Sequence, residues 1–436
     1  MNISAYIESI KSDLLIKKLV SGGIWNGIGL GISKAIMWGS SIIFARMLTK
    51  EEFGNWGYLW STFLTMMMFV DGPWGSAVTK YVSNYKTSNK EKCGQVIALY
   101  FLMMVPVSVL LFCLSFFSKD IAKILKHENL VSAFFFFIIS LVPMGFLSIS
   151  KSIINGFEAF KINSYLIPSI TLIDFLVKIS ALKIWGFNGI TTCVVLSNTV
   201  QLCVVLVVVS RTLRVNRIKI NWKGCLAVSE VIRSYTLPTL GYIAITTCGN
   251  TIVPSLYLST KNGSEIMSGY TVITQLQAVI SFLPLMLATP MLATFSSSFA
   301  KDEKKTWVAI RKIITPFAVT LMICSILLFS FATPLLSLYG EQYLMYKTCL
   351  RLFIPAIIFQ IVCPFINQIF CALERLDLMN CSRLLWFATY LLLGFVFRRY
   401  ELYGIIFAMV ASNFVWLISC LYCVRITKKS QLQLMT

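Results

Sequence analysis

Charged residues are scarce in this chain of 436 amino acids, because only 13% of them are Asp, Glu, Lys or Arg. An average soluble domain is roughly 25% charged. A soluble protein needs charge to cover its surface, so this scarcity excludes an ordinary soluble enzyme. Hydrophobic residues make up 57% of the chain and the mean hydropathy is +0.78. A disordered chain, which lacks apolar residues, is therefore excluded as well.

The residues that usually carry catalysis are also few. The one histidine, His127, falls in a predicted loop, which excludes metal sites and triads built on several histidines. No Walker motif is present, so the chain is not expected to hydrolyse ATP. Cys420 and Cys423 form a C-x-x-C pair inside a predicted membrane span, with no second ligand pair to complete a metal site. We therefore predict that the protein is not an enzyme and has no cofactor.

Acidic residues are outnumbered, with 18 Asp and Glu against 38 Lys and Arg, and the formal net charge is +20. High hydrophobicity with a basic excess is typical of a multi-pass membrane protein whose loops face an anionic cytoplasmic leaflet. The basic residues lie between long apolar runs rather than on one face, which disfavours a nucleic-acid binder.

Long apolar runs are what the sequence does contain. A helix needs roughly 20 apolar residues to cross the hydrocarbon core. These runs are too long and too uniformly apolar for the strands of a membrane barrel, which alternate. The sequence therefore predicts an all-α, multi-pass membrane protein. The twelve predicted spans are 24–47, 56–78, 96–117, 131–154, 165–183, 190–209, 237–258, 266–295, 310–336, 350–370, 378–397 and 402–424.

The distribution of Lys and Arg predicts the orientation. With the N-terminus in the cytoplasm, 24 of these residues fall in cytoplasmic segments and 10 in outer loops, which favours two cytoplasmic termini in the bacterial inner membrane. Glu8 and Asp13 argue against a signal peptide in the first 20 residues. This segment is instead predicted to be a short amphipathic helix on the membrane.

The two halves of the chain resemble each other at an offset of 215–216 residues. Gly189-Ile190 and Ser197-Asn198 match Gly404-Ile405 and Ser412-Asn413, and Phe157-Glu158 matches Leu373-Glu374. Because six spans is an even number, both halves run the same way through the membrane. Two parallel six-helix lobes around a central cavity are expected, working by alternating access. The expected divisions are an N-terminal segment (1–20), an N-lobe (21–212), a cytoplasmic linker (213–235), a C-lobe (236–425) and a tail (426–436).

Ionisable residues inside the spans are the candidate functional residues, since such charges usually face a partner or a wet cavity. Asp174 and Lys178 are four apart and can pair, Lys34 has Asp71 as a possible partner, and these charges together with Lys151 and Arg351 sum to four positive against two negative. A net cationic interior favours an anionic substrate. Amides add hydrogen bonds suited to sugars, although they equally suit helix packing. The predicted substrate-binding residues are Lys34, Asp71, Asp174, Lys178, Arg351 and Asn250.

Two segments carry a resemblance to a known family. The stretches 48–54 (LTKEEFG) and 71–83 (DGPWGSAVTKYVS), with twelve spans in two parallel halves, resemble the polysaccharide transporter family, which includes the O-antigen flippases. The resemblance implies movement of undecaprenyl-pyrophosphate-linked sugar repeat units from the cytoplasmic to the periplasmic leaflet for lipopolysaccharide biosynthesis. It implies a lipid-linked oligosaccharide, membrane lipids, a polysaccharide polymerase and a chain-length regulator as partners. Proton or sodium coupling stays open, with Asp71 as a candidate.

Two alternatives stay open at this point. A cation-coupled multidrug extruder belongs to the same superfamily, but it would be expected to place acids rather than lysines in its cavity. A membrane polysaccharide polymerase would be expected to carry a large outer loop, and the longest outer loop predicted here is short, about 118–130.

Overall fold

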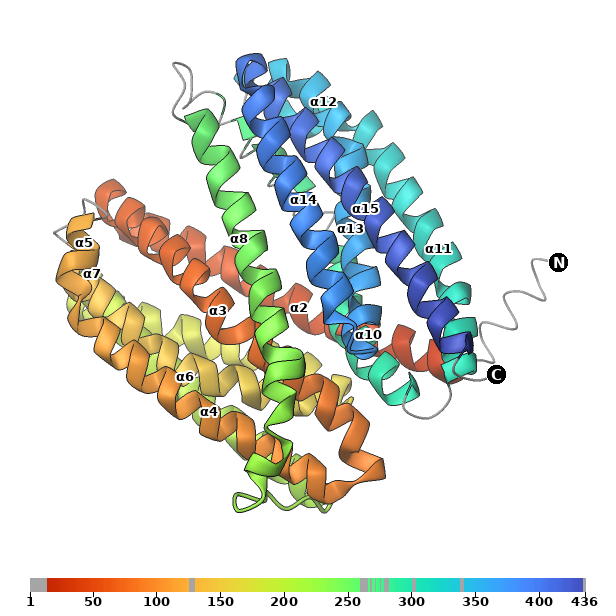
Figure 1. Ribbon diagram of the computed structural model, residues 1–436. Coiled ribbons are helices and arrows are strands. Elements are labelled where there is room, and N and C mark those ends of the chain that lie inside the picture. Colours follow the sequence, from red (N-terminus) through yellow and green to blue (C-terminus); the bar gives the residue numbers. More distant parts are fainter. Residues whose placement is uncertain are drawn as a thin grey trace. The chain divides into compact units, whose positions relative to one another are not determined.

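The structure is a computed structural model that describes residues 14–124, 130–258, 266, 269–270, 272–274, 276–277, 282–299, 303–337 and 341–433. His127 and most of the predicted amphipathic segment, up to Asp13, lie outside the described residues. The regular elements within these ranges are all helices (Figure 1).

The principal helices follow the apolar runs of the sequence. They are α2 (Leu14–Met47), α3 (Lys50–Ser88), α4 (Lys90–Phe116), α5 (Ser118–Ile124), α6 (Val131–Gly156), α7 (Phe160–Val215), α8 (Leu237–Leu258), α10 (Phe282–Phe299), α11 (Glu303–Ser330), α12 (Ala332–Ser337), α13 (Lys347–Ala372), α14 (Leu376–Val396) and α15 (Glu401–Gln433). Within the described ranges, six helices are long and apolar enough by length and composition to cross a membrane.

Helix α7 contains both the fifth and the sixth predicted spans. Its 56 residues are divided at Gly186, which has φ +63° and ψ −149°. This backbone conformation is essentially restricted to glycine, because a Cβ atom would clash there. A single residue therefore separates the two arms of α7.

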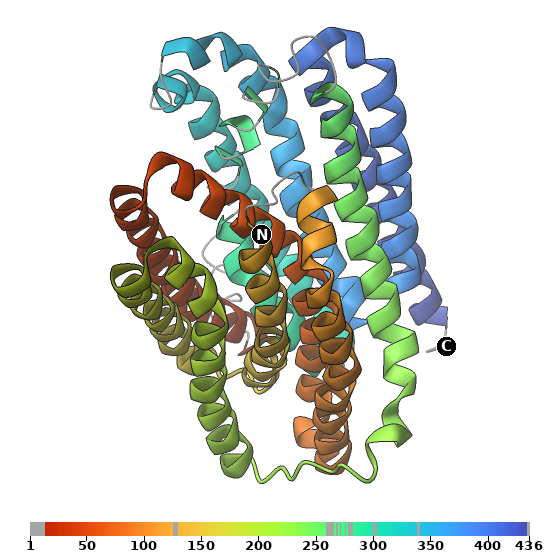
Figure 2. The same cartoon turned by 90° about the vertical axis from the view of Figure 1, so that its left-hand side faces the viewer.

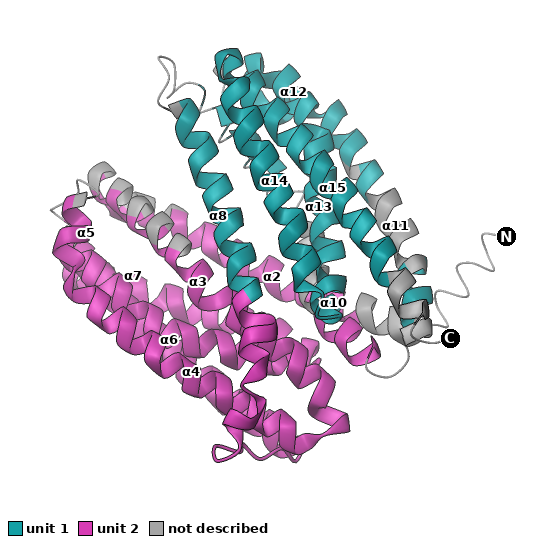
Figure 3. Cartoon of the chain, viewed as in Figure 1, with its two compact units in different colours: residues 1–17, 238–291, 301–436 teal, residues 18–237, 292–300 magenta. Residues whose placement is uncertain are grey.

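The chain forms two compact units (Figure 3). The N-terminal unit contains the described parts of Lys18–Leu237 and Leu292–Ala300, and the C-terminal unit contains the described parts of Met1–Lys17, Pro238–Met291 and Lys301–Thr436. In the first unit α6 packs against α3, α4 and α7. In the second, α13 and α14 both pack against α15.

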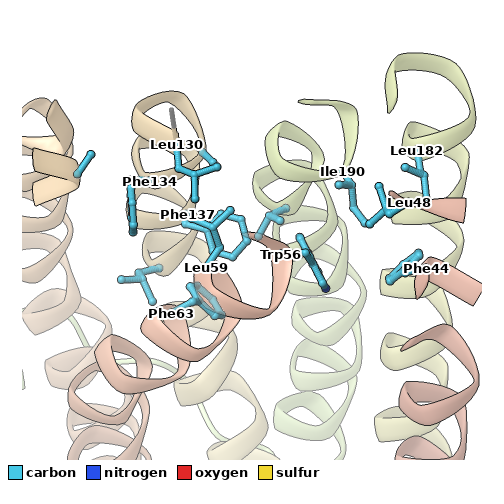
Figure 4. Packing of buried hydrophobic residues seen from close by; sticks show 14 of the residues in the cluster. Phe44, Leu48, Trp56, Leu59, Phe63, Leu130, Phe134, Phe137, Leu182 and Ile190 are labelled. Atoms are coloured by element: carbon cyan, nitrogen blue, oxygen red, sulfur yellow. The ribbon is translucent and has the colours of Figure 1, made fainter. Parts of the chain in front are cut away.

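An aromatic core lies at one end of the N-terminal unit, where parts of α2, α3, α6 and α7 meet (Figure 4). Trp56 packs edge-on against Phe137 at 5.7 Å between ring centroids, and Phe63 packs edge-on against the same ring at 5.5 Å. Such pairs add about 0.5–1.5 kcal/mol each beyond their buried area. This end, predicted to face the periplasm, is thus packed with aromatic rings.

Two helix ends repeat between the halves. After α6, the N–H of Glu158 donates to the carbonyl of Asn155 and that of Ala159 to Ile154; after α13, Glu374 donates to Cys371 and Arg375 to Phe370. Glu158 and Glu374 have φ +58° and +59°. This is a Schellman ending, which normally uses glycine at the left-handed position. The same turn, with the same unusual residue, thus ends the matching helix in each half.

The linker between the predicted lobes connects α7 to α8 (Figure 2). It contains two short helical turns, Cys225–Val228 and Ile232–Thr236. Its second turn is held to the N-terminal unit, because the hydroxyls of Tyr100 and Thr236 lie 2.7 Å apart in a buried hydrogen bond.

We expect Gly404→Ala to destabilise the protein by about 2 kcal/mol. A Cβ atom at Gly404 would lie 2.0 Å from the carbonyl oxygen of Phe397, and the matching Gly189 has the same problem with Ala181 at 2.4 Å. A backbone carbonyl cannot move aside cheaply. The measurement is thermal unfolding of the purified protein in detergent.

Gly241→Ala is the matched control for this prediction. It lies in α8, and among the described residues its Cβ would meet only the side-chain amide nitrogen of Asn380, at 3.8 Å. Alanine is the better helix former, so we expect unchanged or slightly raised stability. Equal losses in both variants would show that the clash at Gly404 is not the cause.

Candidate functional site

The C-terminal unit contains a buried arginine, Arg383. Arg383 lies two turns inside α14 and is only 6% exposed. Its guanidinium carbon lies 3.7 Å from the ring centroid of Trp386 and 4.2 Å from that of Trp416. Its Nε donates a 2.8 Å hydrogen bond to the hydroxyl of Thr246. Ring faces attract cations, so the two tryptophans stabilise this charge without neutralising it.

Arg383 has no carboxylate partner within the described ranges. Its polar neighbours are neutral, namely the Thr246 hydroxyl and the ring of Tyr242 at 5.4 Å. A buried charge without a counter-ion is costly unless something else compensates it. The guanidinium N–H groups that make no hydrogen bond within the described ranges can therefore bind an anion.

A cavity of about 390 Å³ opens beside this arginine. Ligand sites typically measure about 300–1,000 Å³ and place a few polar groups among apolar and aromatic walls. Four amides line this cavity, and amides both donate and accept hydrogen bonds. The amides belong to Asn250, Gln277, Gln360 and Asn413.

The walls of the cavity are held in place by contacts that the local sequence provides. Gly249 lets Trp386 approach, because a Cβ there would lie 2.6 Å from the indole ring. Asn367 donates a 2.9 Å hydrogen bond to the hydroxyl of Tyr242, and Asn380 donates one of 2.9 Å to the carbonyl of Pro238. Gln277 is hydrogen-bonded to Gln360. The cavity is therefore preorganised before any ligand arrives.

A second polar centre lies in the N-terminal unit, on α7. The ammonium group of Lys178 is 2.7 Å from the carboxylate of Asp174, as their spacing of four residues predicts. Across the break at Gly186, Ser197 donates to Asp174 at 2.6 Å and Gln201 at 3.3 Å. This hydrogen-bond network therefore joins both arms of α7.

The tryptophans of α3 cover the cation of this pair. The Lys178 ammonium lies 4.9 Å from the ring centroid of Trp60 and 5.6 Å from that of Trp56. The Lys178 side chain is 4% exposed and that of Asp174 is 27% exposed. The acid therefore faces the accessible side of this pair.

The other predicted site residues are placed separately. Asp71 accepts a hydrogen bond from the hydroxyl of Ser148, and Lys34 is exposed on α2; no ion pair joins these two within the described ranges. Arg351 stacks on the ring of Phe329 at 4.4 Å, and its buried Nε has no hydrogen-bond partner there. Of the six predicted residues, the structure brings Asp174 to Lys178 and places Asn250 in the cavity beside Arg383.

Arg383 was not among the predicted site residues, and its predicted place on the cytoplasmic side is inconsistent with the predicted spans. It was counted among the 24 cytoplasmic basic residues, although it lies inside the predicted span 378–397. The signal was present, since a lone cation in an apolar run with a tryptophan three positions later is hard to explain by topology. With Arg383 moved, the cytoplasmic count becomes 23. The set treated as intramembrane then has five basic residues and two acidic ones, namely Lys34, Lys151, Lys178, Arg351, Arg383, Asp71 and Asp174.

A buried ion pair lies at the end of α6. Lys86 is 2.5 Å from Glu158, with side chains 12% and 7% exposed, and Ser297 donates to the same carboxylate at 2.8 Å. We expect Glu158→Ala to destabilise the protein by about 2 kcal/mol, because the largely buried Lys86 ammonium would lose the carboxylate of Glu158. Thermal unfolding in detergent measures this.

Glu374→Ala is the control, because Glu374 has the same left-handed backbone but is exposed. We expect it to change stability by less than about 1 kcal/mol. A loss at Glu374 as large as that at Glu158 would assign the effect to the turn rather than to the ion pair.

Comparisons with known proteins define the class of fold first. The chain matches an outward-facing multidrug resistance MATE family transporter of the MOP superfamily with a TM-score of 0.80 and 12% identity, covering 97% of this chain and 98% of that one. It matches a MOP superfamily transporter from Pyrococcus furiosus, whose description reports a binding pocket of reverse polarity suggesting a different function, with a TM-score of 0.79 and 13% identity over 94% and 95%. A Vibrio cholerae MATE transporter matches at 0.79 and 12% identity over 96% and 98%.

The fold is therefore that of the MOP-superfamily transporters, which confirms the predicted all-α, two-lobe membrane architecture. No curated protein sequence matches the chain. The family model described as "Polysaccharide biosynthesis protein" matches residues 19–299. The chain belongs to this family, which confirms the predicted resemblance.

Proposed function

We propose that this protein is a flippase that moves undecaprenyl-pyrophosphate-linked polysaccharide repeat units from the cytoplasmic to the periplasmic leaflet of the bacterial inner membrane, with both termini in the cytoplasm. The polysaccharide biosynthesis family supports a glycan substrate. A polysaccharide polymerase and a chain-length regulator would act on the delivered units and are the proposed partners.

The cavity around Arg383 is the observation that carries this proposal. A phosphate or sugar acid crossing hydrocarbon meets an idealised barrier of tens of kcal/mol. A guanidinium with free N–H groups offers such an anion paired hydrogen bonds. The surrounding amides and tyrosines can hydrogen-bond hydroxyl groups of a sugar. One small cavity thus offers complementary groups to both chemical parts of a charged glycan.

Movement is proposed to follow alternating access of the N-lobe (21–212) and the C-lobe (236–425). Asp71 and Asp174 are the acids in the predicted spans, and they are the candidates for proton or sodium coupling. Lys34, Lys178 and Arg351 remain proposed contributors of positive charge along the path.

Deleting the gene tests the proposal. We expect the long-chain polysaccharide ladder to vanish from a lipopolysaccharide gel, while lipid-linked repeat units accumulate on the cytoplasmic side. The wild-type gene should restore the ladder. An intact ladder in the deletion strain would contradict the proposal. Proteoliposomes containing the purified protein and labelled lipid-linked oligosaccharide would then measure translocation directly.

A cation-coupled multidrug extruder is the second candidate, because the fold matches MATE transporters over nearly the whole chain. The polarity of the cavity argues against it, since cationic drugs would be repelled by Arg383. The deletion strain separates the two functions. Increased sensitivity to cationic drugs with an intact ladder would favour extrusion.

A further inference from the structure

A second cavity lies in the linker and shares no lining residue with the cavity around Arg383. It measures about 660 Å³. We call it the linker pocket and define it by its lining residues, which are Lys90, Glu91, Arg217 and Lys219–Lys223. Four of these residues are cations and one is an acid.

The backbone of the linker pocket is fixed to the start of α4. The backbone N–H of Asn221 donates a 3.4 Å hydrogen bond to the carbonyl of Gly94. The side-chain oxygen of Asn221 accepts a 3.0 Å hydrogen bond from the N–H of Gly224. A Cβ at Gly94 would lie 2.0 Å from the carbonyl of Lys219, so glycine is required for this close approach. The cations therefore lie on a part of the linker that packs against α4.

Apolar contacts with α4 also hold this segment in place. Cys225 is 3% exposed and packs with Ala98 and Leu99 of α4, and Ile220 packs against this group. Burial of these side chains stabilises one conformation of the linker. The rim of the pocket thus has a defined shape.

The four cations of the linker pocket outnumber its one carboxylate, Glu91. Within the described ranges, no ion pair is formed by Lys90, Arg217, Lys219 or Lys223. The side-chain amide of Asn221 donates a 3.4 Å hydrogen bond to the carboxylate of Glu91. Membrane orientation depends on the number of nearby cations and needs no pocket. Arg211 and Arg214, exposed on the last turns of α7, already carry charge there without lining the cavity.

Trp222 is an exposed aromatic residue in the lining of the linker pocket. Its side chain is 55% exposed and lines the same cavity. The apolar span of α4 begins beside the pocket, within Lys90–Phe116. Tryptophan is enriched at the membrane interface, where its ring contacts both lipid and water. A ligand that reaches both the cations and this ring is anionic at one end and apolar nearby.

We propose that the linker pocket binds the phosphate headgroup of an anionic membrane lipid on the cytoplasmic face. The phosphate contacts the rim cations, and Trp222 packs against the glycerol and upper acyl region. Binding fastens the linker between the two lobes to the membrane surface. The site is separate from the cavity around Arg383 and does not depend on the flippase assignment.

The test uses two full-length double variants of equal charge. Lys219→Gln with Lys223→Gln removes two cations from the pocket, and Arg211→Gln with Arg214→Gln removes two from the neighbouring helix end. Native mass spectrometry of the purified protein in detergent would titrate phosphatidylglycerol, with phosphatidylcholine and inorganic pyrophosphate as separate probes. We expect the pocket variant to bind phosphatidylglycerol about 30-fold more weakly. The helix-end variant should bind like the wild type.

Equal loss of phosphatidylglycerol binding in both double variants would overturn the proposal, because general surface charge would explain it. Trp222→Ala distinguishes a lipid from a soluble phosphate. We expect weaker phosphatidylglycerol binding in this variant and no change for pyrophosphate. Unchanged lipid binding in Trp222→Ala, or tighter binding of pyrophosphate than of phosphatidylglycerol, would overturn the lipid assignment. All substituted side chains are exposed, and unchanged thermal unfolding would confirm that each variant is folded.

Discussion

Arg383→Gln is expected to slow substrate translocation about 100-fold, the equivalent of about 3 kcal/mol. The variant keeps a polar, though shorter, side chain beside Trp386 and Trp416 and removes the charge that lines the cavity. An anionic group would then enter without a counter-charge. The rate of lipid-linked oligosaccharide translocation in proteoliposomes measures the loss, and the polysaccharide ladder reports it in cells.

Two further substitutions make this result specific. Arg383→Lys keeps the charge but lacks the planar fork of donors, so we expect an intermediate rate. Arg375→Gln removes a cation directly before α14, where the arginine side chain is 34% exposed and paired with Asp377 at 3.3 Å. This control should transport normally. Normal transport by Arg383→Gln, with the control also normal, would remove the arginine from the proposed site.

Asp174→Ala is expected to lower the free energy of unfolding by about 3 kcal/mol, the largest stability loss of the changes considered. Lys178 would stay buried against Trp60 with its counter-ion gone, and Ser197 and Gln201 would lose their shared acceptor. The value lies at the lower end for a buried pair because the Asp174 side chain is 27% exposed. Thermal unfolding in detergent measures the change.

The double variant Asp174→Ala with Lys178→Met provides the decisive comparison. Removing both charges leaves an apolar side chain against the tryptophans, so we expect most of the lost stability to return. Transport by this stable variant would then report whether Asp174 contributes to ion coupling. A double variant as unstable as the single one would show that the stability loss does not come from the unpaired lysine.

Hydropathy predicts the helices of this chain well, because a bilayer requires long apolar segments whose backbone groups pair internally. The predicted span 237–258 coincides with α8, and Asp174 and Lys178 pair because one helical turn joins them. The cavity around Arg383 could not be assembled from the sequence. Its walls come from helices far apart in the chain, and their rotation depends on packing that no single apolar run reveals. The linker pocket likewise depends on one close backbone approach at Gly94.

The two halves share a helix ending but differ in their charged residues. Glu158 and Glu374 occupy the same left-handed turn, yet residues 389 and 390, which match Asp174 at the two offsets, are Thr389 and Tyr390, and the positions matching Arg383 are Ile167 and Pro168. The two halves thus share a helix ending but carry different charged side chains. A chain engineered from two copies of the first half would have two acid networks and no tryptophan-bound arginine; a chain from two copies of the second would have the reverse.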